Sequence, residues 1–178
     1  MRALVTGGGR GIGAGIARAL ARDGWDVVVG ARSGAQVQTV AGEIGGEWVQ
    51  VDVSDRGSVE RMVAEAREVD LLVANAGVSE GHAQRPSWEI DLDDWWQVYE
   101  VNVLGVHLCC RAVIPGMLER GRGRIVIPAA GRPTCPAARA PRMRRARLPF
   151  VATARCWQTN SRGGFLSSSS ALAWCKQS

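Results

Sequence analysis

The sequence predicts an α/β fold in which helices cover both faces of a doubly wound parallel sheet. Two observations predict it. Between residues 2 and 127, short apolar runs rich in valine alternate with longer segments whose apolar side chains recur at helical spacing. A glycine cluster also follows the first apolar run, at the point where a strand would turn into a helix. Strands separated by single helices form right-handed crossovers, which give a parallel sheet.

The first half of this region alternates strand and helix. Residues 2–6 are an apolar run that ends in glycines, which predicts a strand followed by a loop. Ile12, Ile16 and Leu20 fall at helical spacing, and Gly24 suits the end of that helix. The same patterns predict a strand over 26–29, a helix over 37–44 and a strand over 48–51.

The second half continues the alternation up to residue 127. Ser54 or Asp55 can cap a helix that carries Val59 and Met62. Pro115 lies within a long helix and must bend or end it. The remaining predicted elements are a strand over 70–74, the long helix over 93–119 and a fifth strand over 124–127, after which we expect the sheet to be truncated.

Residues 128–178 are a different kind of sequence. Residues 1–127 hold 17 acidic side chains and 13 arginines, whereas residues 128–178 hold eight arginines, one lysine and no acid. Five of the seven prolines also lie in this tail, where the apolar period stops. We therefore expect a dinucleotide-binding domain over 1–127 and a tail over 128–178, rich in Arg, Pro and Ser, that is non-native or disordered.

Composition and motif counts argue against several classes of protein. The five cysteines include no Cys-x-x-Cys pair and there are only two histidines, so no metal site is expected. No apolar run approaches the roughly 18 residues of a membrane span, so no membrane partner is expected. The N-terminus runs into glycines and has no signal-peptide core, which predicts a cytoplasmic protein.

The chemistry of the first domain is centred on the glycine cluster after the first strand. Glycines permit a tight turn and let the backbone approach a pyrophosphate, and the following helix offers N–H groups and a positive dipole. The candidate binding residues in this loop are Gly7, Gly9, Arg10, Gly11, Ile12 and Gly13. A glycine-rich turn without a ligand is the alternative.

Five motifs in residues 1–127 resemble those of the short-chain dehydrogenase/reductase family. They are Thr6-Gly7-x-x-x-Gly11-x-Gly13, the pair Asp52-Val53, Asn75-Ala76-Gly77, the segment from Tyr99 to Gly105 that contains Asn102, and Gly123-Arg124-Ile125-Val126. The resemblance implies a Rossmann-type fold and an NAD(P)-dependent oxidoreductase acting on a small carbonyl or alcohol substrate. It also implies a homo-oligomer, adenine contacts from Asp52 and Val53, cofactor contacts from Asn75, Ala76 and Gly77, and a catalytic role for Asn102.

The end of the second strand favours NADP over NAD. Members of the family that use NAD usually carry an Asp there, which accepts hydrogen bonds from the ribose hydroxyls. Here Ala31 is followed by Arg32 and Ser33, and no acid is present. Arg32 and Arg10 could flank a 2′-phosphate, because guanidinium groups bind phosphate through paired hydrogen bonds. The alternative is that both arginines are solvated surface groups.

The family's main catalytic residues are missing from this chain. The resemblance implies a Ser after the fifth strand and then Tyr-x-x-x-Lys, with Tyr as the general acid and base. The only tyrosine is Tyr99, before Asn102, and the only lysine is Lys176. After Ile127 the Ser position reads Pro128-Ala129-Ala130, so we expect this chain to be inactive.

The genetic code suggests why. If each tail codon is regrouped as its third base plus the first two bases of the next codon, Trp174-Cys175 must read Val and Cys156-Trp157 must read Leu. Residues 142–148 can then read Tyr-Ala-Ala-Ser-Lys-Ala, and residues 128–130 can read Ser-Ser. These matches fall in the family's order, which leads to the hypothesis that the tail is a frameshifted reading of a reductase gene.

Two other functions are consistent with the sequence, and one group of tryptophans has two interpretations. The chain could be a non-catalytic dinucleotide-binding remnant. The arginine-rich tail has the charge of a nucleic-acid binder, but it lacks interleaved aromatic residues, so no nucleic-acid partner is expected. Trp88, Trp95 and Trp96 could line a substrate mouth, although packing of the long helix is favoured.

Overall fold

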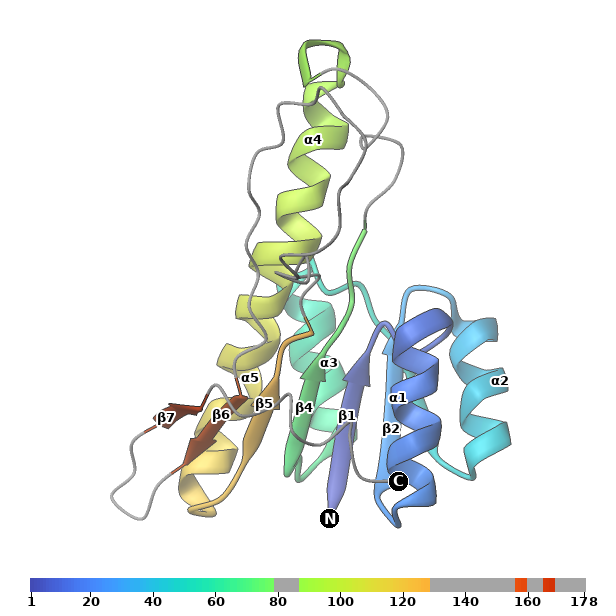
Figure 1. The fold of residues 1–178 in the computed structure, drawn as a ribbon, viewed down its shortest axis with the longest axis vertical. Helices are drawn as coiled ribbons and strands as arrows, with labels where there is room; N and C mark the ends of the chain where they lie inside the picture. Colours follow the sequence, from blue (N-terminus) through green and yellow to red (C-terminus); the bar gives the residue numbers. More distant parts are fainter. Residues whose placement is uncertain (79–86, 129–155, 160–164, 169–178) are drawn as a thin grey trace, which may run out of the picture.

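Five parallel strands form the main sheet of the computed structural model, which describes residues 1–78, 87–128, 156–159 and 165–168. The strands lie in the order β3-β2-β1-β4-β5, so the chain starts in the middle of the sheet and winds outward in both directions (Figure 1). This confirms the doubly wound parallel sheet. The strands are β1 (Arg2–Thr6), β2 (Asp26–Ala31), β3 (Glu47–Gln50), β4 (Leu71–Ala74) and β5 (Arg124–Val126).

Helices cover both faces of this sheet, and each covered face has its own apolar core. Because successive strand side chains point to opposite faces, Leu4 and Val28 belong to one core and Val5 and Val29 to the other. The first core packs against α3 (Arg56–Ala66) and α5 (Gly105–Glu119), and the second packs against α1 (Gly11–Arg22) and α2 (Gly34–Ile44). The near-continuous apolar strands follow from burial on both faces.

The long helix is a composite of three pieces. The α-helix α4 (Leu92–Tyr99) is followed by a π-helical segment, η3 (Glu100–Leu104), and then by α5. The sequence does not predict the π-helical segment. Pro115 lies inside α5, which continues to Glu119, so of the two expected outcomes, a bend or an end of the helix, the end does not occur at this proline. A short 3-10 helix, η2 (Ser87–Glu89), precedes α4.

The composite helix also corrects the expectation that no segment reaches membrane-spanning length. Its 28 residues, Leu92–Glu119, are long and apolar enough to cross a membrane by length and composition alone. The C-terminal half, however, packs on the sheet and buries Cys109, Val113 and Met117. A core helix of this kind meets the same two criteria, so the finding is weak evidence for a membrane span.

The N-terminal half of the composite helix extends past the carboxyl ends of the strands (Figure 1). None of the α4 side chains is buried. Trp88 and Trp96 are 82% and 57% exposed, so the interpretation of the tryptophans as helix-packing residues is wrong for these two. Trp95 contacts the ring of Tyr99, with centroids 4.4 Å apart, on the surface of the same helix.

Two antiparallel strands extend the sheet beyond β5. β6 (Cys156–Thr159) pairs with β5, and β7 (Phe165–Ser168) pairs with β6. Among the described residues, β5 is therefore the last parallel strand, as the sequence predicts, whereas the sheet itself continues through β6 and β7. His82, Ala129 and Ala130 of the family's Ser position, and the position of its Tyr-x-x-x-Lys motif lie outside the described residues, as does the rest of the tail apart from Pro128 and the two strands.

Candidate cofactor-binding site

The carboxyl ends of β1 and β4 are joined by a buried hydroxyl. Thr6, the last residue of β1, is 1% exposed. Its Oγ1 donates to the carbonyl of Val73 (3.4 Å) and accepts from the backbone N–H groups of Asn75 and Ala76, each at 3.1 Å. A second hydrogen bond joins the same two residues, since Nδ2 of Asn75 donates to the carbonyl of Thr6 at 3.1 Å. The glycine loop and the Asn-Ala-Gly segment thus form one rigid edge.

Gly7 and Gly13 are required by this close approach. A Cβ atom on Gly7, which has a positive φ of 67°, would lie 2.8 Å from the Cα of Ala76. A Cβ on Gly13 would lie 2.2 Å from the carbonyl oxygen of Gly7 and 2.5 Å from Nδ2 of Asn75. Gly9 has a related role, because a Cβ there would lie 2.9 Å from Cβ of Gln36. The loop packs against α1, α2 and the end of β4.

The N-terminus of α1 opens at this edge. Arg10 is the N-cap residue and makes no side-chain capping bond, and the first turn holds no acidic residue. Gly11 begins the helix with a positive φ of 55°. Helix N-termini of this kind present N–H groups and a positive dipole to an anion. Ile12 is 73% exposed here, so it is a surface residue of the first turn of α1 and not part of the apolar face that its spacing suggests.

The turn between β2 and α2 carries the residues predicted to select the cofactor. Arg32 and Ser33 are exposed, and Ser33 is the N-cap of α2 without a side-chain capping bond. The first turn of α2 holds no acidic residue. The turn therefore offers a cation, a hydroxyl and a helix N-terminus, and it lacks the carboxylate that would bind ribose hydroxyls.

Asp52 and Val53 follow β3, and their side chains lie in different surroundings. Asp52 is partly exposed, and its Oδ1 accepts from the N–H and the hydroxyl of Ser54, at 3.0 and 2.6 Å. Val53 is only 5% exposed. Its Cγ2 would lie 2.8 Å from a Cβ on Gly105, so the valine side chain packs against the long helix. Of the pair, Asp52 is the residue whose side chain a ligand can reach.

Asn102 is brought to the same edge by the π-helical segment. Its Oδ1 accepts from the N–H of Val78 and its Nδ2 donates to the carbonyl of Val78, both at 2.9 Å. A Cβ on Gly77 would lie 3.1 Å from Oδ1 of Asn102, so a glycine leaves room for the amide. The Asn102 side chain thus holds the segment after β4, and both of its polar atoms are engaged.

The structure brings the predicted residues to one edge from the four segments that follow β1, β2, β3 and β4 and from η3, which supplies Asn102. The sequence analysis does not single out Val78 or Gln50, and it names Thr6 only as part of the glycine motif. The hydroxyl of Thr6 and the backbone of Val78 hold the edge together, and Gln50 at the end of β3 donates from Nε2 to the carbonyl of Arg32 at 3.0 Å. The motif includes Thr6, but no local pattern reveals that Gln50 or Val78 meets a residue from another segment.

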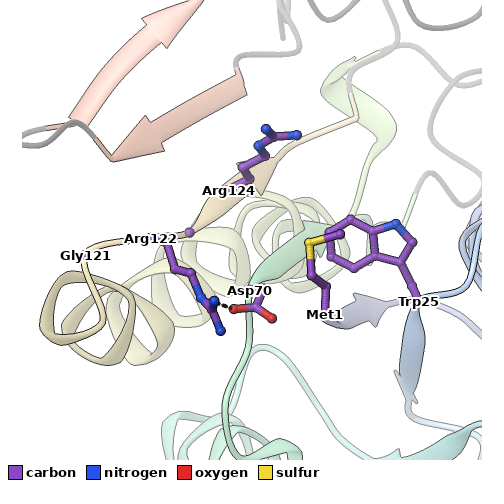
Figure 2. A pocket seen from close by; sticks show the side chains of 7 residues that line it. Met1, Trp25, Asp70, Gly121, Arg122 and Arg124 are labelled. Atoms are coloured by element: carbon purple, nitrogen blue, oxygen red, sulfur yellow. Dashed lines mark hydrogen bonds and ion pairs between the residues drawn. The ribbon is translucent and has the colours of Figure 1, made fainter.

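One hollow among the described residues lies at the other end of the strands. It holds about 360 Å³. Figure 2 shows the indole of Trp25 beside Met1, and the ion pair between Arg122 and Asp70, at 3.1 Å, on another wall. Its remaining lining residues, Gly121, Gly123 and Arg124, precede or begin β5. Ligands of open α/β sheets bind at the carboxyl ends of the strands, so this hollow is distinct from the candidate site.

The chain belongs to the short chain dehydrogenase family, whose sequence pattern matches residues 1–132. NADP-dependent 3-hydroxy acid dehydrogenase YdfG of Salmonella typhi is 36% identical over 132 residues, which are 71% of this chain and 52% of that protein. Cis-4-hydroxycyclohexanecarboxylate dehydrogenase of Sinomonas cyclohexanicum is 40% identical and is covered to the same extent, 52%. The chain thus spans about half the length of these curated relatives.

Solved structures show the same fold. The closed form of a serine dehydrogenase complexed with NADP+ is 34% identical and superposes with a TM-score of 0.67, covering 71% of this chain and 53% of the other. A 3-ketoacyl-(acyl-carrier-protein) reductase from Brucella melitensis complexed with NADH is 36% identical, with a TM-score of 0.65, covering 67% and 51%. Similar proteins have therefore been solved with either nicotinamide dinucleotide.

Proposed function

We propose that residues 1–127 bind a nicotinamide dinucleotide, with NADP(H) preferred over NAD(H), as the cofactor-binding domain of an oxidoreductase for a carbonyl or alcohol substrate. The observation that carries the proposal is the edge formed by the N-termini of α1 and α2. Neither has a side-chain cap or an acid in its first turn. Two such helix N-termini suit two groups of phosphates on one ligand.

The residues of this edge fit the cofactor. The glycine loop would let its backbone approach the pyrophosphate, and we assign contacts with the rest of the ligand to the exposed Ile12 and to the Asn75–Gly77 segment. Arg10, Arg32 and Ser33 would receive the 2′-phosphate, and Asp52 would contact the adenine side. When bound, the cofactor supplies or accepts a hydride. Asn102 would hold the Val78 segment in place beside it through its two hydrogen bonds.

The preference for NADP(H) can be tested at Arg32. Replacement by alanine, Arg32→Ala, should weaken NADPH binding about 10- to 150-fold, because a hydrogen bond to a charged group contributes about 1.5–3 kcal/mol. NADH binding should not change. Arg22→Ala, at the exposed end of α1 and on the far edge of the sheet, is the matched control. Fluorescence titration of both cofactors gives the four dissociation constants, and equal NADPH affinity in the two variants would refute the assignment.

We also propose that residues 128–178 are read in a shifted frame, so that they form no catalytic half and this chain does not turn over substrate. The proposal is supported by the end of the family match at residue 132 and by the absence of any tyrosine after Tyr99. Sequencing of the gene across the Ile127 codon tests it. An unshifted frame confirmed at that codon would leave the tail as a genuine part of the protein.

A further inference from the structure

We propose that Gln50 is a positioning residue for cofactor selection. Its side-chain amide holds the turn between β2 and α2 in the shape that presents Arg32 and Ser33 to the 2′-phosphate of NADP(H). This inference rests on the proposed preference for NADP(H) and concerns a residue outside the family's motifs found here.

The first observation is a hydrogen bond that extends the sheet beyond its last backbone pair. Gln50 is the last residue of β3, and its Cα pairs with that of Ala31 at the end of β2. The N–H of Val51 donates to the carbonyl of Ala31 at 3.0 Å. At the next residue after β2, Arg32, the backbone turns away from β3. The side chain of Gln50 bonds to it instead, since Nε2 donates to the carbonyl of Arg32 at 3.0 Å. The amide side chain thus continues the ladder where backbone pairing ends.

The second observation is the contact with the start of α2. A Cβ on Gly34 would lie 3.4 Å from Oε1 of Gln50, and 3.8 Å from the indole of Trp48. The turn therefore rests on the side chains of β3. Because β3 is the edge strand of the sheet, these side chains are the outer support of the turn.

The position of this turn matters because the groups it presents are exposed. Arg32 is exposed, and Ser33 makes no capping bond that would fix its hydroxyl. The geometry with which they meet a phosphate is therefore set through the backbone of the turn. Preorganisation of this kind raises affinity by lowering the entropy lost on binding. NAD(H) has no 2′-phosphate, so its affinity depends much less on this geometry.

The test replaces the amide by an apolar group of similar size. Gln50→Leu should raise the dissociation constant of NADPH about three- to tenfold, the range expected for one neutral hydrogen bond. The constant for NADH should stay within a factor of two of the wild-type value, which is about the scatter of such titrations. Gln38→Leu, the same substitution at an exposed position on α2, is the control and should change neither constant.

Two further variants separate the possible outcomes. Gln50→Glu keeps the length and removes the donor, so it should weaken NADPH binding at least as much as Gln50→Leu. In the Arg32→Ala background, Gln50→Leu should have little further effect. Equal weakening of NADPH and NADH, or no weakening of either, would overturn the inference. If Arg32→Ala itself leaves NADPH binding unchanged, the proposed preference fails instead.

Discussion

Among the glycines of the loop, Gly13 leaves the least room for a side chain. Replacement by alanine should place a Cβ 2.2 Å from the carbonyl of Gly7, which is backbone and cannot rotate away. We expect Gly13→Ala to cost about 1–3 kcal/mol of folding free energy, as overpacked sites do, and to abolish measurable NADPH binding. Urea unfolding and cofactor titration measure the two effects.

Gly15, two residues further along α1, provides the matched control. A Cβ there meets nothing within 4 Å. Since alanine favours an exposed helix over glycine by up to about 1 kcal/mol, Gly15→Ala should stabilise the protein slightly and leave cofactor binding intact. A destabilisation of similar size in both variants would show that helix α1, and not the close approach of the loop, is the sensitive feature.

Cys109 should make stability fall at high pH. Burial in the core raises the pKa of its thiol to about 12, and the neighbouring Cys110 adds a smaller effect. The thiol of the unfolded chain ionises at about 8.5. Because the folded pKa is the higher one, the thiol does not affect the pH dependence below about 8.5. Between about 8.5 and 12 the free energy of unfolding should fall by at most about 1.4 kcal/mol per pH unit.

Urea midpoints of the wild type and of Cys109→Ala between pH 7 and pH 10.5 measure this effect. The variant should be less stable at neutral pH because of the cavity it creates, and its stability should fall less steeply at high pH. Parallel curves for the two proteins would contradict the assignment of the fall to Cys109.

Helix α3 begins at a side-chain cap, for which the sequence offers both Ser54 and Asp55. Asp55 is the N-cap residue, and its Oδ1 accepts from the N–H of Ser58 at 2.6 Å. Asp55→Ala should cost about 0.5–2 kcal/mol of folding free energy, as is usual for the loss of a capping bond. Ser33→Ala, at the N-cap of α2 where no such bond exists, should cost much less when measured without cofactor. Equal costs would mean that the bond contributes little.

The composite helix shows how one element serves both core and site. α5 buries its face on the sheet, whereas the π-helical segment before it turns Asn102 toward Val78. π-helical segments inside α-helices often occur at functional sites, because the extra residue redirects one side chain. The helical spacing of apolar residues along this helix predicts its length, but it does not reveal the extra residue of the π-helical segment.

The molecule as a whole should bind cofactor without reducing a substrate. Proton transfer to the substrate oxygen requires a placed acid, and such groups contribute about 10²–10⁴-fold to a rate. Tyr99 lies on α4 and contacts Trp95 at the surface, so it is not placed to serve. Carbonyl reduction with NADPH should be tested on a panel of ketones, for this chain and for a version with the reading frame restored.

Only the restored protein should show turnover, and Asn102→Ala should reduce it. Turnover by the chain as it stands would mean that another residue acts as the acid and that the tail has a function. Loss of that turnover in Asn102→Ala would then show that it depends on the edge that Asn102 holds together.

Local patterns in the sequence determined the five parallel strands, the helices between them and the glycine loop, because apolar periodicity and glycine positions act over a few neighbouring residues. The resemblance to the family, and not these patterns alone, implied the site residues that follow β1, β2, β3 and β4. Only the tertiary structure decided which of those side chains a ligand can reach and which are buried. Whether Ile12 and Val53 are exposed or buried depends on which distant segments pack beside them. The bond between Gln50 and the turn at Arg32 likewise joins two segments that are apart in the sequence.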